Sequence, residues 1–212
     1  MDDRSESSNF TDLLDYRRQV GELYGEVRRG GTGATASHER FRQRRNELFA
    51  SHPQSPLNRA QRGEFAGLSY FPYDPGLRFC LPVDTDVTAE AFEVRLQDDG
   101  PVMLERVAKV RFSLQGQPAE LSLFWLGGYG GGLFLPFRDA SNGTETYGGG
   151  RYLLDTIKGV DLGAEAGRLI IDFNYAYNPS CAYDSRWDCP LPPAENWLHR
   201  PVRAGEMGYA HR

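Results

Sequence analysis

The sequence predicts an α+β protein that is mainly β, an antiparallel barrel or sandwich with N-terminal helices and an irregular C-terminal strap. Two observations predict this fold. From Leu68 onward, short β-branched or aromatic runs recur at roughly ten-residue intervals, divided by Gly, Pro, Asp and Asn. That spacing is too tight for helices between the strands, so the sheet is expected to be antiparallel. Before Leu68, apolar residues instead recur every three or four positions, as in amphipathic helices.

The helices are expected in the N-terminal third. Residues 10 to 29 have helical spacing, with carboxylates near the start, where they suit the helix dipole. Ser37 is the expected N-cap of a second helix that ends before Pro53. A further short helix is predicted in LNRAQRGEF, because Pro56 just before it suits a first helical position.

The domain organisation follows from length and composition. At 212 residues the chain can bury a substantial core. The glycine-rich stretch GGTGATA at residues 30 to 36 predicts a flexible break. We therefore expect residues 1–36 to be a peripheral helix and linker, and residues 37–212 to form a single mainly-β domain. From Asn178 the chain is rich in Pro, Trp and Tyr, and we expect it to wrap over the sheet.

Several predicted strands carry polar residues at every second position. In VAKVRFSL the apolar residues alternate with Lys109 and Arg111, and in LIIDFNY they alternate with Asp172 and Asn174. Successive side chains of a strand point to opposite faces of the sheet. These polar faces either meet water outside or line a shared cleft, and the sequence leaves both interpretations open.

Composition excludes several classes of function. The net charge of −5 argues against a general nucleic-acid or membrane-surface binder. The sequence contains no run of about 18 apolar residues, so no membrane-spanning helix is predicted. MDDRSESSNF lacks the features of a secretory signal. The three cysteines, an odd number, do not suggest a disulfide framework, so a cytoplasmic protein with reduced thiols is expected.

No metal or cofactor site is expected. Cys181 and Cys189 lie eight residues apart with no His between them, and the four His form no ligand pattern. Because no His lies in the β region, a Cys181 nucleophile would lack a base, and a buried structural thiol is favoured. The stretch LGGYGGGLFLP lacks the Gly-Lys-Ser/Thr end of a phosphate loop and predicts a hairpin instead.

The most informative stretch is FRDASNGTETYGGGRYLLD, residues 137 to 155. Its Asn-Gly pair predicts a hairpin turn, and the following triple Gly predicts a second bend. The chain would then double back and bring Arg138, Tyr147 and Arg151 together as a receptor for a carboxylate or phosphate. The alternative is that the two arginines form structural ion pairs with nearby acids. Further ligand contacts are expected from Lys109, Arg111 and Asn174.

These residues leave three classes of function open. The first is a protein that binds a small anionic metabolite in a polar cleft of the β domain. The second is an enzyme of the same cleft, such as a hydrolase, with Glu145, Asp155 or Asp172 as general base. The third is a protein–protein interaction module. An enzyme is expected to show a cleft carboxylate whose pKa is raised by burial and which has no Arg partner.

Several long motifs resemble a known family. FRDASNGTETYGGGRYLLD, DFNYAYNPSCAYD, CPLPPAEN and RAGE are similar to the signature of a bacterial and archaeal "domain of unknown function" family. SPLNRAQRGEFAGLSYFPYD matches the aromatic motif that begins it, and the resemblance covers about residues 38 to 206. It implies a single, mainly β domain and brings no activity, substrate or catalytic residue. The first helix and its Gly-rich break lie outside this pattern.

Overall fold

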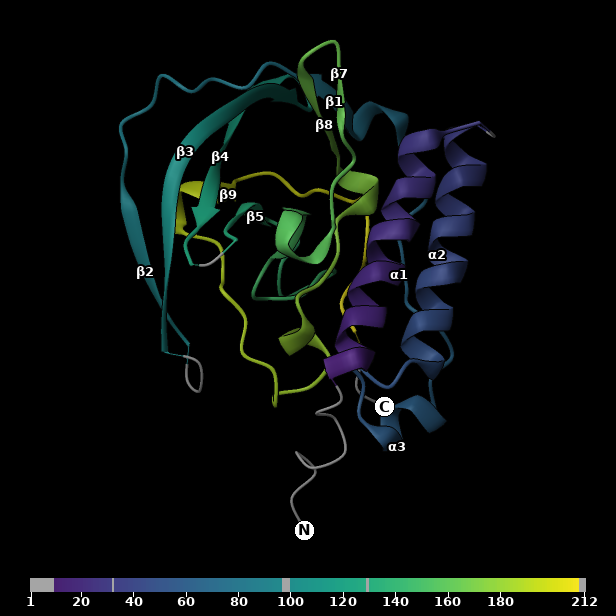
Figure 1. The fold of residues 1–212 in the computed structure, drawn as a ribbon. Coiled ribbons are helices and arrows are strands. Elements are labelled where there is room, and N and C mark those ends of the chain that lie inside the picture. The colour runs from purple at the N-terminus through teal and green to yellow at the C-terminus, as the bar shows by residue number, and fades with distance from the viewer. Residues whose placement is uncertain (1–9, 32, 97–99, 129, 210–212) are drawn as a thin grey trace.

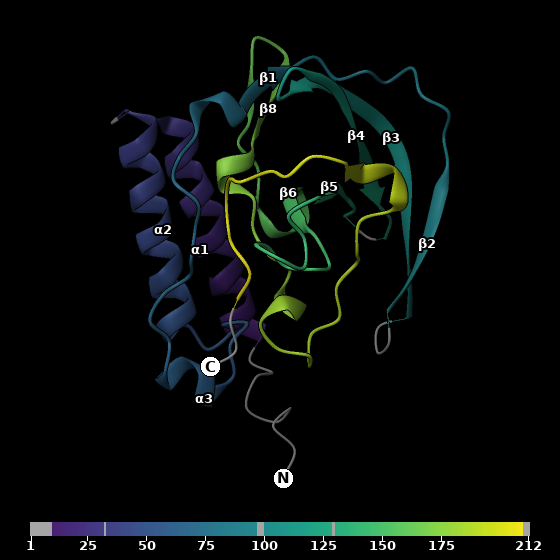
Figure 2. The same cartoon turned by 180° about the vertical axis from the view of Figure 1, so that it is seen from behind.

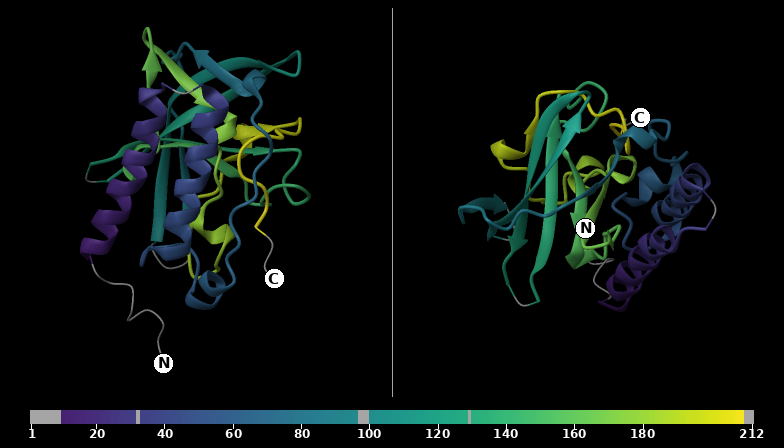
Figure 3. Two further views of the ribbon diagram at one scale, coloured as in Figure 1. Left: turned by 90° about the vertical axis from the view of Figure 1, so that its right-hand side faces the viewer. Right: turned by 90° about the horizontal axis from the view of Figure 1, so that it is seen from above.

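The computed structural model describes residues 10–31, 33–96, 100–128 and 130–209. The chain begins with the helices α1 (Phe10–Arg29), α2 (Ala34–Ser51) and α3 (Arg59–Gly63). Helices α1 and α2 lie side by side along one flank of a curled antiparallel sheet, which forms a half-barrel (Figures 1 and 3). The predicted α+β, mainly β fold with N-terminal helices is therefore confirmed.

Two sheets make up the β region. The larger has the order β2-β3-β4-β5-β6, with every neighbouring pair antiparallel, and β9 adds to β5 in parallel. The smaller has the order β1-β8-β7. The strands of the larger sheet are β2 (Ala91–Leu96), β3 (Gly100–Leu114), β4 (Gln117–Leu126), β5 (Gly132–Asp139), β6 (Arg151–Asp155) and β9 (Trp197–Leu198). Those of the smaller sheet are β1 (Arg78–Leu81), β7 (Ala164–Glu165) and β8 (Arg168–Asp172).

The long β3–β4 hairpin shows why the sheet forms. Its two-residue loop, Gln115 and Gly116, has φ angles of 51° and 77°, the left-handed conformation that suits the twist of a hairpin. Along β3 the side chains alternate between buried and more exposed, with Val110 and Leu114 inside. The predicted two-residue periodicity of this strand is confirmed.

The core has three parts: one inside the half-barrel, one between the sheet and the helices, and one around Phe49 of α2 and Tyr183 of the C-terminal segment. The second part includes Val20, Leu23 and Tyr24 of α1, which pack with residues such as Leu104 and Phe124 of the sheet. Helix α1 thus buries its apolar face against the rest of the fold. Within the described residues, no helix combines the length and apolarity needed to cross a bilayer.

Two helix starts differ from the sequence prediction. Helix α2 begins at Ala34, so Ser37 lies within its first turn, and its main-chain N–H donates to the carbonyl of Gly33 at 3.0 Å. Helix α3 begins at Arg59 and not at Pro56, because Asn58 and Gln61 form a reciprocal capping box. The C-terminal segment crosses from the long strands towards the helices as an irregular strap, drawn in yellow in Figure 2.

Candidate functional site

The structure does not bring Arg138 and Arg151 together. Strands β5 and β6 pair around the predicted turn, but a one-residue bulge shifts their register between Leu135 and Pro136. Beyond the bulge, Phe137 lies opposite Arg151. Because side chains alternate along a strand, Arg151 shares a face with Phe137, and Arg138 points to the other face.

Arg151 is fully buried and bonded to the protein. Its Nη2 donates to Asp139 Oδ2 at 2.8 Å and to the carbonyl of Val202 at 2.8 Å. Its Nη1 donates to the carbonyls of Ala204 and Glu206. Burial lowers the pKa of this guanidinium, and the neighbouring Asp139 opposes that shift. Arg151 therefore clasps the C-terminal strap to the sheet, which is the structural ion pair that the sequence left as an alternative.

The other predicted ligand contacts also have protein partners. Arg138 donates to the carbonyl of Gly148 at 2.6 Å and lies over the ring of Trp197. The Tyr147 hydroxyl lies 3.5 Å from the sulfur of Cys181.

Lys109 and Arg111 extend from β3 and both bond to Glu120, at 2.5 Å and 2.6 Å. These two side chains form an ion-pair network on the outer face of β3, where Arg111 also bonds to Asp84 at 2.5 Å. They take no part in a cleft with Asn174.

Two of the three predicted catalytic carboxylates are paired. Glu145 accepts from Arg203 at 2.7 Å, and this bond lowers the pKa of Glu145. Asp155 lies 3.3 Å from Nζ of Lys158. Neither side chain has the environment expected of a general base.

Asp172, the third, is different. It lies directly across the strand pair from Arg78, yet the Arg78 guanidinium bonds to Glu165 instead, at 2.7 Å. Asp172 Oδ1 accepts from the main chain and side chain of Asn174, and Oδ2 accepts from the Tyr73 hydroxyl at 3.3 Å. No ion pair joins Asp172 to any described residue. Burial raises the pKa of this carboxyl, against the lowering effect of its hydrogen bonds.

A second layer fixes the position of Asp172. Asn174 is fully buried, and its side chain bonds to both the main-chain N–H and the carbonyl of Asp74 at 2.8 Å. His38 of α2 lies 2.9 Å from the Asn174 carbonyl. Because burial lowers the pKa of His38 to about 4, the ring is neutral at pH 7, and its Nε2 carries the proton donated to that carbonyl. Asn174 thus serves to orient Asp172.

Asp172 lines a cleft of about 250 Å³ between the α1–α2 connection and the smaller sheet. Gly33 occupies the N-cap of α2 with φ of 77° and offers no side chain to the first amides, and the first turn contains no acidic residue. A helix start of this kind carries partial positive charge. Arg28 and Arg78 also line the cleft. The cleft therefore combines the buried carboxyl of Asp172 and the exposed carboxylate of Glu165 with three positive groups.

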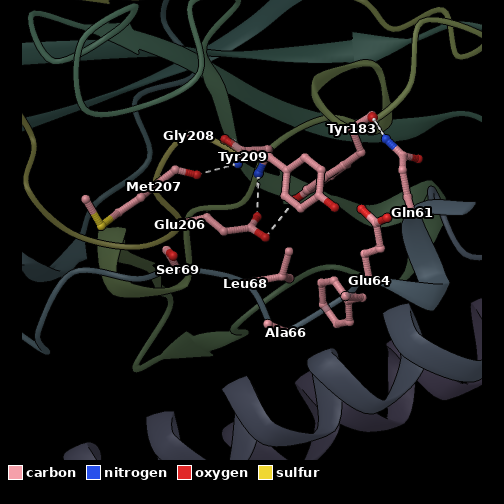
Figure 4. A pocket seen from close by; sticks show the side chains of 13 residues that line it. Gln61, Glu64, Ala66, Leu68, Ser69, Tyr183, Glu206, Met207, Gly208 and Tyr209 are labelled. Carbon is pink, nitrogen blue, oxygen red and sulfur yellow. Dashed lines mark hydrogen bonds between the residues drawn. The ribbon is translucent and has the colours of Figure 1, made fainter. Parts of the chain in front are cut away.

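A second, smaller pocket of about 150 Å³ also contains a buried carboxylate, Glu206 (Figure 4). This carboxylate accepts from the Tyr183 hydroxyl at 2.6 Å and the Asn178 main chain at 2.7 Å, and it is paired with Arg45 at 3.2 Å. Because Glu206 is held by a buried arginine, it does not meet the criterion for a general base. We therefore identify the Asp172 cleft as the candidate site.

Sequence reasoning named Asp172 and Asn174 but missed the other wall of the cleft. Tyr73 lies in the aromatic motif SPLNRAQRGEFAGLSYFPYD but was given no role there, and Arg78 lies outside the quoted motifs. The α2 start at Gly33 was hidden within a stretch interpreted as a flexible break. A glycine followed by a run of helix formers was the one local signal.

Comparisons with known proteins agree on the fold. Residues 63–207 match the family described as "Protein of unknown function (DUF1684)". The solution NMR structure of an uncharacterized protein from Haloarcula marismortui is similar, with a TM-score of 0.58 and 37% sequence identity, over 81% of this chain and 92% of that one. No curated protein matches the chain. The family match includes Tyr73, Arg78 and Asp172, whereas α1 and α2 lie before it.

Proposed function

The chain belongs to the DUF1684 family of proteins of unknown function, and we propose that it binds a small molecule bearing a carboxylate or phosphate group in the Asp172 cleft. The observation that carries this proposal is the start of α2, which opens on the cleft without a capping side chain at Gly33. Free amides and the helix dipole together favour an anion at such a position.

The two arginines of the cleft are available to such a ligand. Arg28 bonds to Asp161 at 2.8 Å, and Arg78 bonds to Glu165 at 2.7 Å. All four side chains are a third or more exposed. Ion pairs this exposed contribute at most about 1 kcal/mol each. A bound anion can therefore replace Asp161 or Glu165 as the partner of the guanidinium at a small cost in free energy.

Asp172 supports a second candidate function, an enzyme such as a hydrolase in the same cleft. Its pKa is raised by burial, and it is the member of the predicted trio without an ion pair to a described residue. Protonated, it would donate to an oxygen of the bound molecule; ionised, it would accept a proton from water or a hydroxyl group.

Binding is tested by thermal shift of the full chain against panels of carboxylates and phosphate esters, since a ligand of the folded state must raise the melting temperature. The variant Ala34→Glu places a negative charge in the first turn of α2, where the cleft begins. It should abolish the shift while stabilising the free helix by about 0.3–1 kcal/mol. The neutral control Ala34→Gln should retain the shift.

A matched pair of arginine variants adds a second test. Arg78→Met should weaken binding of any hit about tenfold or more, as expected for loss of a charge-assisted bond. Arg111→Met removes a more exposed, ion-paired arginine from another strand and should leave binding unchanged. Wild-type affinity in both Ala34→Glu and Arg78→Met would reject the site.

Asp172→Asn separates binding from catalysis. In an enzyme, this variant should retain the thermal shift and lose roughly 10²–10⁴-fold in turnover of esters of the hit compound. Equal turnover in the variant and the wild type would reject the catalytic function and leave ligand binding as the proposal.

A further inference from the structure

Two of the three cysteines face one another in the C-terminal strap. Cys181 lies in the short 3-10 helix Ser180–Ala182, and Cys189 follows after a turn. The main-chain N–H of Cys181 donates to Cys189 Sγ at 3.4 Å. Both side chains are half-buried, which differs from the buried structural thiol that the sequence favoured. The pair is therefore adjacent and open to small reagents.

The surroundings of the two sulfurs are not equivalent. The side chain of Cys181, main-chain amides and the positive charge of Lys158 together lower the pKa of Cys189 to about 7, although burial opposes the shift. The side chain of Cys189 and burial raise the pKa of Cys181. Cys189 is thus the sulfur that ionises first, and Cys181 remains a thiol beside it.

Cys80 provides an internal comparison. It lies on β1, half-buried like the other two, and its sulfur is near the carbonyl oxygens of Glu165 and Arg168, at 3.8 Å and 3.9 Å. Carbonyl oxygens are hydrogen-bond acceptors and do not stabilise a thiolate. Exposure alone therefore does not distinguish the pair from Cys80, but the donors around Cys189 do.

We propose that Cys181 and Cys189 form a redox-active dithiol that low-molecular-weight disulfides oxidise to an intramolecular disulfide. The Cys189 thiolate attacks one sulfur of the reagent, which forms a mixed disulfide and releases one thiolate. The Cys181 thiol gives its proton to that thiolate, and its sulfur attacks Cys189 Sγ, which releases the second thiolate. In total, two electrons pass from the two cysteines to the reagent: the protein dithiol is oxidised to a disulfide, and the reagent disulfide is reduced to two thiols.

The tyrosine next to the pair belongs to the stretch that carried the sequence-based site. The Tyr147 hydroxyl lies 3.5 Å from Cys181 Sγ. Tyr152 of β6 donates to the carbonyl of Pro190, directly after Cys189, at 2.6 Å. These contacts hold both ends of the Cys181–Cys189 segment against β6 and the loop before it, so the two sulfurs are kept together without a disulfide.

Peptide mapping of the wild-type chain tests the proposal without any variant. The reduced protein is incubated anaerobically in glutathione buffers of graded ratio, alkylated and digested with trypsin. Arg186 lies between the two cysteines, so oxidation should yield two peptides joined only by the Cys181–Cys189 bond, while Cys80 remains alkylated. Recovery of all three cysteines alkylated in the most oxidising buffer would overturn the proposal.

Serine variants then test the order of the steps. Cys181→Ser should accumulate a glutathione adduct on Cys189, because no second thiol resolves it. Cys189→Ser should react at Cys181 at least about tenfold more slowly, since its thiol is mostly protonated at pH 7. Cys80→Ser is the matched control and should oxidise at the wild-type rate. Equal adduct formation on all three cysteines would show that the pair has no special reactivity.

Discussion

Replacing Arg151 by Met should destabilise the protein severely, because it breaks a fully buried ion pair. Both Arg151 and Asp139 have side chains with no exposed surface, and their charged atoms lie 2.8 Å apart. Removing one member of such a pair typically costs about 3–5 kcal/mol, since the other charge is left buried. The carbonyls of Val202 and Ala204 also lose a donor, at roughly 0.5–1.5 kcal/mol each.

Together these contributions amount to about 4–8 kcal/mol. The expected loss for Arg151→Met is at the lower end, about 4–5 kcal/mol, because Asp139 still accepts from the main-chain N–H groups of Ser141 and Val202. A domain is normally stable by about 5–15 kcal/mol. The variant should thus lose a large share of its free energy of unfolding and release the C-terminal strap from the sheet.

Urea unfolding followed by circular dichroism measures this loss. With a slope of about 2 kcal/mol per molar urea, the midpoint should fall by roughly 2 M. The double variant Arg151→Met/Asp139→Asn should be more stable than the sum of the two single losses by about 0.5–3 kcal/mol, because it leaves no charge unpaired. Arg111→Met, at an exposed pair, should lose less than about 1 kcal/mol. If Arg151→Met also lost less than about 1 kcal/mol, Arg151 would not hold the strap to the sheet as described.

Three further predictions concern buried groups and one glycine. Burial lowers the pKa of His38 from 6.5 to about 4, so the unfolded chain binds more protons than the folded chain between these pH values. The free energy of unfolding should therefore fall by roughly 3 kcal/mol as pH drops from 6.5 to 4. Urea titrations at several pH values should show a smaller fall for His38→Gln. The pKa of Asp172 is raised, so its effect on stability has the opposite pH dependence. Asp172 contributes most to stability below the ordinary pKa of Asp, and this contribution is lost as pH rises through the pKa of the folded state. Asp172→Asn should therefore raise the urea midpoint at pH 7 but not at pH 3, and a lower midpoint at pH 7 would contradict the environment described for it. An alanine at Gly205 would place its Cβ 2.6 Å from the carbonyl oxygen of Ala176 at a φ of 74°, so Gly205→Ala should lose several times the roughly 1 kcal/mol expected for Gly167→Ala, which has a similar φ in open space; thermal melts compare the two.

Local patterns were sufficient for the fold class. The alternation along β3, the turn residues between strands and the helical spacing of residues 10 to 29 are each properties of a few neighbouring residues. The cleft is different, because its walls come from the start of α2, the segment before β1 and the end of β8. Their proximity depends on the strand order β1-β8-β7, a long-range pairing that no local pattern encodes.

The predicted arginine receptor failed to assemble because of a single residue. Without the bulge, the pairing of Leu135 with Leu154 would continue and set Arg138 directly opposite Arg151. Pro136 lies at the shift, and proline within a sheet is confined largely to edges and bulges because it has no N–H to donate. The proline in LFLPF was therefore the sequence signal that the register would change, and with it the face that each arginine occupies.

The same type of pair, an arginine beside an aspartate, has opposite outcomes in the two sheets. Arg151 stays with Asp139, while the nearby buried carboxylate of Glu206 is paired with Arg45, and the Arg151–Asp139 pair holds the strap. Arg78 leaves Asp172, its cross-strand neighbour, for the exposed Glu165. Neutralising Asp172 would relieve the cost of its burial, so the native aspartate keeps the fold below its attainable stability at neutral pH. A carboxyl that destabilises the structure around it, in a cleft that also contains a positive helix start, supports the proposed ligand site, because packing alone gives no reason to retain it.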